Sequence, residues 1–134
     1  MSINRLTKED IRKESGTFSP TGHIVVAFTN DAVAAQAATT LHTQGFEAED
    51  VLSYTSPEVL KRLREMVAGA SEAAGFGYEI TLMKRYLTLA EAGAGWLIVY
   101  SPEDSATEKV TKVATDLKAL CAVRYGRLVN EDLV

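Results

Sequence analysis

Histidine and cysteine, which often act as general base, nucleophile or metal ligand, are scarce in this sequence. The chain holds two histidines, His23 and His42, and one cysteine, Cys121. A nucleophilic cysteine needs a base beside it, and a zinc site needs several His, Cys, Asp or Glu residues at ligand spacing. Neither pattern surrounds these three residues in the sequence. We therefore predict no catalytic residues, no metal site and no cofactor, with Cys121 as a small buried side chain and both histidines in structural or solvated positions.

Glycine-rich turns are the next candidates for chemistry, because they can hold phosphate groups. A phosphate-binding loop follows a strand and opens a helix. Gly93-Ala94-Gly95 stands in the opposite order, after a predicted helix and before a predicted strand. We interpret it as a turn.

Four polar or aromatic side chains could instead line a ligand pocket over a β-sheet: His23, Tyr54, Arg85 and Tyr100. They offer an imidazole, two phenols and a guanidinium, which could bind a small molecule or the substrate of a small enzyme. The alternative is that tyrosines at strand ends pack against neighbouring elements, and that the cations of this region pair with nearby glutamates.

Two stretches of the sequence resemble each other and indicate the elements that position these side chains. Residues 22–31 and 95–104 align without a gap, each running from a glycine through an apolar segment to an aspartate. Such a segment followed by a helical pattern is typical of a β-α unit, and we expect Ser101 and Pro102 to start the second helix. Each unit returns into a shorter strand. The predicted strands are 24–28, 51–54, 96–100 and 122–125.

The two long strands are almost continuously apolar, which indicates burial on both faces and a central place in a sheet. The two short strands contain Ser53 and Arg124 and suit the edges. The predicted fold class is α+β, a ferredoxin-like sandwich with a duplicated β-α-β unit and the strand order 4-1-3-2. We expect this single domain to span 22–134, with its end, 128–134, as a tail. Residues 1–21 form an N-terminal arm, either mobile or docked on a partner subunit.

Residues 55–94 separate strands 2 and 3, and their pattern predicts a helical-hairpin insert. The second helix of this insert has two apolar lines. The first line is Ile80, Met83, Leu87 and Ala90, and the second is Tyr78, Leu82, Tyr86 and Leu89. A helix with one buried side needs one such line, so we predict that the second forms the interface of a homo-oligomer, with a dimer favoured. The hairpin or a second subunit must also cover the sheet face opposite the β-α-β helices.

Composition and charge exclude several classes of partner. The chain has 134 residues and a formal net charge of −4, whereas nucleic-acid binding requires a basic surface. No apolar run approaches the roughly 20 residues that span a bilayer. A single cysteine cannot form an internal disulfide, which suits a reducing compartment. We therefore expect a cytoplasmic protein that binds neither nucleic acid nor membranes.

One segment carries a family resemblance. It reads Ile24-Val25-Val26-Ala27-Phe28, then an alanine-bearing helix with Ala34, Ala37 and Leu41, then Gly45-Phe46 and Asp50-Val51. This segment is similar to the opening of the small bacterial general stress proteins. The resemblance implies a bacterial cytosolic protein linked to stress and carries over no catalytic residue.

Together these features favour a non-enzymatic, oligomer-forming protein with a regulatory or stress-related role. One alternative is a ferredoxin-like module that senses a small molecule. Another is a small dimeric α+β enzyme with a pocket over the sheet. The enzyme hypothesis requires the four candidate ligand-binding side chains named above to converge on one cavity.

Overall fold

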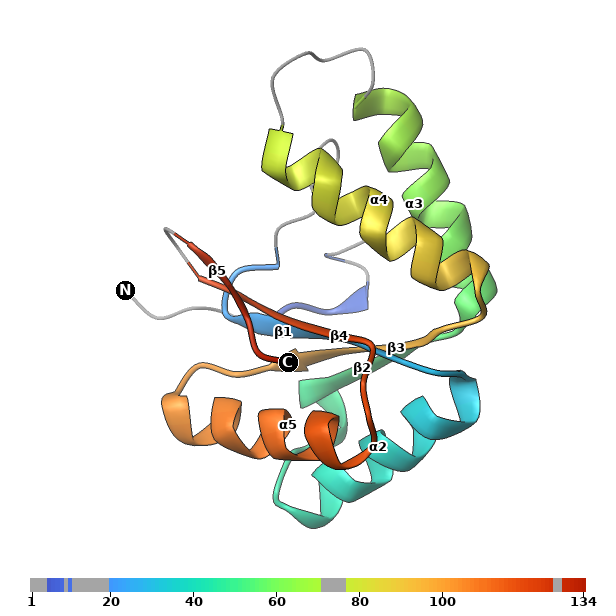
Figure 1. Cartoon of the computed structure of the whole chain (residues 1–134). Coiled ribbons are helices and arrows are strands. Elements are labelled where there is room, and N and C mark those ends of the chain that lie inside the picture. The colour runs from blue at the N-terminus through green and yellow to red at the C-terminus, as the bar shows by residue number, and fades with distance from the viewer. Residues whose placement is uncertain (1–4, 9, 11–19, 71–76, 127–128) are drawn as a thin grey trace.

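Three layers make up the part of the chain that the computed structural model describes, which comprises residues 5–8, 10, 20–70, 77–126 and 129–134. A β-sheet forms the middle layer, helices α2 (Asp31–Thr43) and α5 (Asp104–Asp116) lie on one face, and helices α3 (Ser56–Ala70) and α4 (Gly77–Glu91) lie on the other (Figure 1). We call these the α2–α5 face and the α3–α4 face.

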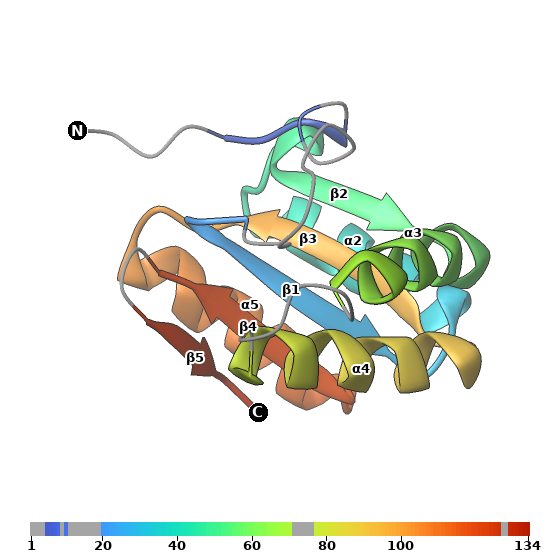
Figure 2. The same ribbon diagram turned by 90° about the horizontal axis from the view of Figure 1, so that it is seen from above.

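The strands of this sheet are β1 (His23–Phe28), β2 (Val51–Tyr54), β3 (Gly95–Tyr100), β4 (Cys121–Tyr125) and β5 (Asn130–Asp132). Their order is β2-β3-β1-β4-β5, with every neighbouring pair antiparallel (Figure 2). The first four strands have the predicted positions and order, and β1-α2-β2 and β3-α5-β4 form two βαβ units.

The prediction of a C-terminal tail beyond β4 is wrong, and so is the edge position of β4. Asn130 pairs with Tyr125 to begin β5, and beside this pair the backbone N–H of Gly126 donates to the carbonyl of Val129 at 3.0 Å. Asn130-Glu131-Asp132 has none of the β-branched or aromatic residues that indicate a strand. This strand therefore depends on pairing with β4 rather than on its own composition.

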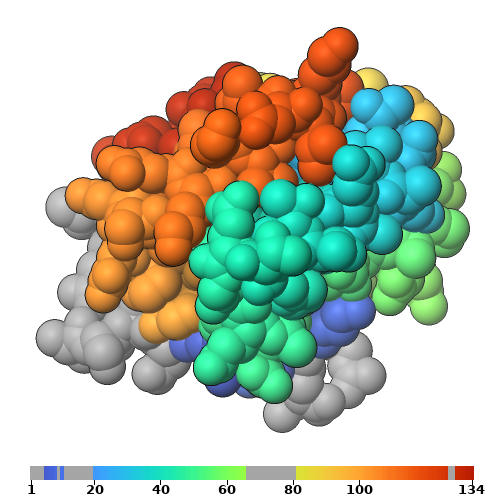
Figure 3. Space-filling view, turned by 90° about the horizontal axis from the view of Figure 1, so that it is seen from below, coloured from blue at the N-terminus to red at the C-terminus, as the bar shows by residue number. Residues whose placement is uncertain are grey.

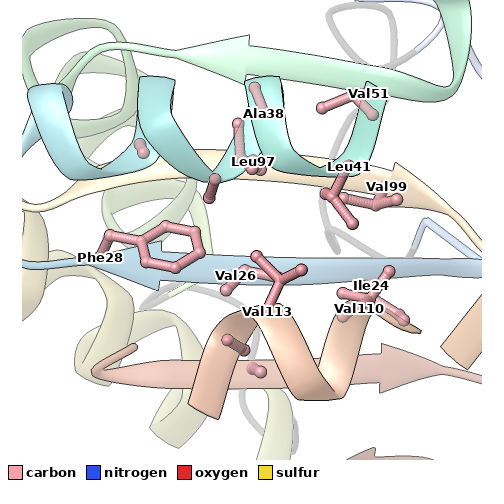
Figure 4. Close-up of a cluster of buried hydrophobic side chains, with 14 residues drawn as sticks. Ile24, Val26, Phe28, Ala38, Leu41, Val51, Leu97, Val99, Val110 and Val113 are labelled. Atoms are coloured by element: carbon pink, nitrogen blue, oxygen red, sulfur yellow. The ribbon is translucent and has the colours of Figure 1, made fainter. Parts of the chain in front are cut away.

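Side chains alternate across the central strands and fill both faces. On the α2–α5 face, Val26 and Phe28 of β1 and Leu97 of β3 pack against Leu41 of α2 and Val113 of α5 (Figure 4). The alanines of α2 allow a close approach to the sheet, and α2 and α5 lie side by side as the outer surface of this layer (Figure 3).

Contacts at the helix starts determine where α2 and α5 begin. The Asn30 side chain caps α2 by accepting from the Val33 N–H at 2.9 Å. Gly95 opens β3 against this cap, because a Cβ there would lie 2.5 Å from the Asn30 carbonyl oxygen. The predicted start of α5 at Ser101-Pro102 is two residues too early. Ser101 is fully buried, and its hydroxyl pairs with the Thr107 hydroxyl at 2.7 Å instead of capping the helix.

Helices α3 and α4 cover the other face of the sheet. The sequence predicted that either this insert or a second subunit covers that face, and the insert does. The Ser56 hydroxyl donates to the carbonyl of Ala90 at 2.7 Å, which joins the start of α3 to the end of α4. Leu63 of α3 and Ala90 of α4 are both buried against β1, β3 and β4. The α3–α4 face of the sheet is thus covered by helices of the same chain.

The line of α4 predicted as an oligomer interface therefore has a different role. Leu82 and Tyr86 are 6% and 1% exposed within the single chain, and Leu89 is partly buried against the same cluster. The side chain of Tyr78 lies outside the described residues. Helix α4 has two apolar lines because it contacts both the sheet and α3, so the second line is explained without a partner.

Replacing Leu82 with glutamate tests this assignment. We expect Leu82→Glu to lower the free energy of unfolding by about 3 kcal/mol or more, because it buries a carboxylate without a partner. Thr88→Glu, at an exposed position of the same helix, should change it by less than about 0.5 kcal/mol. Urea denaturation measures both. A Leu82→Glu protein as stable as wild type, altered only in oligomeric state, would restore the interface interpretation.

Candidate functional site

Two hydrogen-bond donors lie buried and unpaired at one end of the α3–α4 face. Tyr54 of β2 and Trp96 of β3 are direct cross-strand partners, and both pack in the cluster beneath α3 and α4. Among the described residues, neither the Tyr54 hydroxyl nor the Trp96 indole Nε1 has a hydrogen-bond partner, although both atoms are buried. Leaving a buried polar group unpaired costs about 1–3 kcal/mol, so this pair needs a physical explanation.

The protonation state of this pair follows from its burial. Burial, with a smaller contribution in the same direction from the nearby Glu58 carboxylate, raises the pKa of Tyr54 to about 12. The phenol is therefore protonated at physiological pH. An indole N–H only donates. Each group can thus donate to an acceptor oxygen or nitrogen, and both belong to the apolar cluster that also includes Leu60 and Leu63 of α3.

Tyr86 of α4 links this end of the face to the other. Its ring meets the Trp96 ring edge-on, with the centroids 5.3 Å apart and the planes at 78°. Its hydroxyl lies 2.8 Å from the Tyr125 hydroxyl of β4, and both side chains are buried. Ala27 of the central strand β1 belongs to the same buried cluster as Tyr86.

His23 and Tyr100 occupy the opposite end of the same face. They are cross-strand partners on β1 and β3, and their ring centroids are 5.2 Å apart. The His23 ring is 1% exposed. Its Nδ1 lies 3.0 Å from the carbonyl oxygen of Thr21, and its Nε2 lies 3.1 Å from the backbone nitrogen of Leu6.

Residues 5–8 of the N-terminal arm, which we call the strap, lie along the β2 side of the α3–α4 face. The Arg5 guanidinium donates to Asp50 at 2.9 Å, and the Leu6 side chain packs into the cluster of that face. The Lys8 ammonium lies 4.6 Å from the centroid of the Tyr54 ring. This described part of the arm therefore docks on its own chain, from the His23 end to the Tyr54 end.

The four predicted ligand-binding residues separate into three places. His23 and Tyr100 are in contact, whereas Tyr54 pairs with Trp96 at the far end of β3. Arg85 is an exposed residue of α4, and its guanidinium lies 3.8 Å from the Asp132 carboxylate of β5. The sequence pattern indicated that all four lie over the sheet, but it did not give the register of the strands. That register separates Tyr54 from Tyr100 by the length of a strand. Trp96 was not predicted as a site residue and Tyr86 was assigned to the interface line, because only cross-strand and cross-layer neighbours show their place in this site.

The other candidate groups lie away from any reactive arrangement. Cys121 is buried, and burial raises the pKa of its thiol, which keeps it protonated. His42 is exposed near the end of α2, where its Nδ1 lies 3.0 Å from the carbonyl oxygen of Phe46. Within the described residues no cluster of three or more His, Cys, Asp or Glu side chains could hold a metal ion.

Comparison of the chain with models of protein families, with curated proteins and with solved structures gives no match. The similarity to the small bacterial general stress proteins therefore stays a prediction. In the described part of the chain, no helix has both the length and the apolar character needed to cross a bilayer.

Phenylalanine substitutions separate the unpaired hydroxyl from a paired one. Tyr54→Phe should raise the free energy of unfolding by about 1 kcal/mol, because it removes a buried hydroxyl that has no partner. Tyr86→Phe should lower it by about 1 kcal/mol, because it breaks the hydrogen bond to Tyr125. Chemical denaturation measures both. Equal losses of stability in the two variants would show that the Tyr54 hydroxyl is already paired.

Proposed function

We propose that this protein is a non-catalytic, ferredoxin-like module that binds a small molecule between its sheet and the helix pair α3–α4. The observation that supports the proposal is the pair of buried donors on Tyr54 and Trp96, which have no partner among the described residues. A ligand that accepts from both would remove the energetic cost of leaving them unpaired. Of the functions considered from the sequence, the small-molecule sensor fits this observation best.

The surroundings of the donor pair favour a neutral ligand that carries a hydrogen-bond acceptor and is otherwise planar or apolar. Leu60 and Leu63 of α3 supply apolar surface, and Trp96 supplies an aromatic ring. The charges nearest to Tyr54 are opposite in sign, the Lys8 ammonium and the Glu58 carboxylate. Because they offset each other, a carbonyl or amide oxygen suits this position better than a free carboxylate or phosphate.

The titratable side chains buried on the α3–α4 face support binding rather than catalysis. A general base must be unprotonated and able to reach the proton it removes. Burial keeps the Tyr54 phenol and the Cys121 thiol protonated. Both ring nitrogens of His23 already have backbone partners. None of these three groups is thus available as a base or a nucleophile.

Self-association, a stress-related role and a cytoplasmic location remain predictions. Leu82 and Tyr86 are buried within the single chain, so a homo-oligomer would have to use a different surface from the one first expected. The binding proposal needs no second subunit, because the donor pair and the elements around it belong to one chain.

A thermal-shift screen tests the proposal. We expect at least one member of a panel of amides, ketones, nucleobases and amino acids to raise the melting temperature. A ligand at 100 times its dissociation constant stabilises the folded state by about 2.7 kcal/mol. Trp96 is the only tryptophan, so its fluorescence should change with the same compound and at the same concentrations.

Two variants make the screen specific for the donor pair. Tyr54→Phe keeps the ring and removes one donor, so it should weaken the thermal shift produced by the active compound. Ser53→Ala, at the adjacent exposed position of β2, should leave that shift unchanged. A panel without any active compound, or a shift that Tyr54→Phe leaves intact, would contradict the proposed function.

A further inference from the structure

The hydrogen bonds of His23 determine which of its ring nitrogens carries the proton. The backbone N–H of Leu6 can only donate, so the Nε2 that it approaches at 3.1 Å must be an unprotonated acceptor. The carbonyl of Thr21 can only accept, so the Nδ1 at 3.0 Å carries the hydrogen. The strap is therefore bonded to one particular state of the imidazole, the neutral tautomer with its proton on Nδ1.

Protonation of His23 would convert this contact from attraction to repulsion. A second proton on Nε2 would face the Leu6 N–H, donor against donor, within a site where the ring is 1% exposed. The Arg5 side chain is 38% exposed, and those of its partners Glu47 and Asp50 are 71% and 18% exposed, so solvent screens these ion pairs. The bond between Leu6 and His23 is thus the strap's main buried polar attachment.

We propose that His23 and the strap, residues 5–8, form a pH-dependent latch, closed on the α3–α4 face when the imidazole is neutral and released when it is protonated.

Among the described side chains around His23, the imidazole is the group whose ordinary pKa lies near neutral pH. The ring of Tyr100 on β3 lies beside it, tilted by 46°. The backbone carbonyl of Tyr125 on β4 accepts from the backbone N–H of Gly22, the residue before His23, and the Tyr125 hydroxyl is bonded to Tyr86 of α4. Among charged groups, Arg5 of the strap is paired with Asp50 and Glu47, and Lys8 lies over Tyr54 at the other end of the face.

The direction of the pH response follows from burial. Burial lowers the pKa of His23 from its ordinary 6.5, and the carbonyls of Thr21 and Pro20 oppose the change only in part. With the strap released, the exposed imidazole takes up a proton more readily than with the strap closed. The closed state is therefore fully favoured above pH 6.5 and loses its advantage as the pH falls through and below that value.

A released strap would also uncover part of the proposed ligand site. Lys8 lies over the ring of Tyr54, so removing the strap opens the approach to that donor. This consequence rests on the proposed function, whereas the latch itself does not. The experiment below therefore detects the strap directly and uses no ligand.

Hydrogen exchange of the Leu6 amide, followed by NMR, tests the latch in the full chain. Expressed as a protection factor, its protection should fall about tenfold between about pH 7.5 and about pH 5, as expected when one buried hydrogen bond is lost. The protection of Leu97 in the central strand should stay constant over the same range. The midpoint for Leu6 should coincide with the titration of the His23 ring and not with that of His42.

Two substitutions provide the matched controls. Glutamine at position 23 offers an acceptor near the Nε2 position that never becomes charged, so His23→Gln should keep Leu6 protected at both pH values. His42→Gln, at the exposed histidine, should leave the wild-type response intact. If the His23→Gln variant does not fold, the wild-type chain still tests the latch, because the midpoint of Leu6 protection must coincide with the titration midpoint of the His23 ring.

Three outcomes would overturn the latch. They are a Leu6 protection that does not change with pH, a midpoint that follows His42, and a parallel fall in the protection of Leu97, which would mean that the whole domain opens. None of them bears on the thermal-shift screen. A failed screen likewise leaves the latch standing.

Discussion

The structure depends on a central pair of strands that is apolar on both sides. From Ile24 to Phe28 on β1 and from Trp96 to Val99 on β3, every residue is at most 5% exposed. Burying each Val- or Leu-sized side chain is worth roughly 1.5–3 kcal/mol, so neither face of these strands can be left in water. The two βαβ units provide helices for one face only. The helix pair α3–α4 is therefore needed to cover the second.

The way in which the second face is covered explains where polar groups are buried. Helix α4 contributes Tyr86, whose ring meets the Trp96 ring edge-on and whose hydroxyl pairs with Tyr125. Tyr54 and Trp96 bring polar atoms under the same cover without partners of their own. Buried polar groups in native proteins are nearly always paired, so an exception involving two adjacent donors is a reasonable place for a ligand. The strap closes the β2 side of this layer through His23.

The central architecture could be predicted from the sequence because it depends on local patterns. The apolar runs that end at Phe28 and Tyr100 predicted the central strands, and the insert was recognised as one of two possible covers. The strand β5 could not be predicted, since Asn130-Glu131-Asp132 has no strand pattern and forms only against β4. The start of α5 was misplaced because the Ser101 side chain bonds Thr107 inside the protein instead of capping the helix.

The site was harder to predict, because it depends on register and on contacts between layers. The sequence identified Tyr54, His23 and Tyr100 as candidates. The structure is needed to show that the Tyr54 hydroxyl lacks a hydrogen-bond partner and that Tyr54 lies opposite Trp96 in the sheet. The two apolar lines of α4 indicated two contact surfaces, but Leu82, Tyr86 and Leu89 of the second line, which was assigned to another subunit, pack within the single chain. A sequence pattern shows how much surface must be buried, and it does not show whether the same chain or another one buries it.

The central claim is that one chain covers both faces of its own sheet, and nuclear Overhauser effects test it most directly. We expect strong effects between the Tyr86 ring and the Trp96 indole in uniformly labelled protein. They should be absent from an isotope-filtered spectrum of labelled chains mixed with unlabelled chains, because both rings belong to the same molecule. Effects that are missing from the first spectrum, or that appear in the filtered one, would contradict the account, because the cover would then be absent or supplied by a second chain.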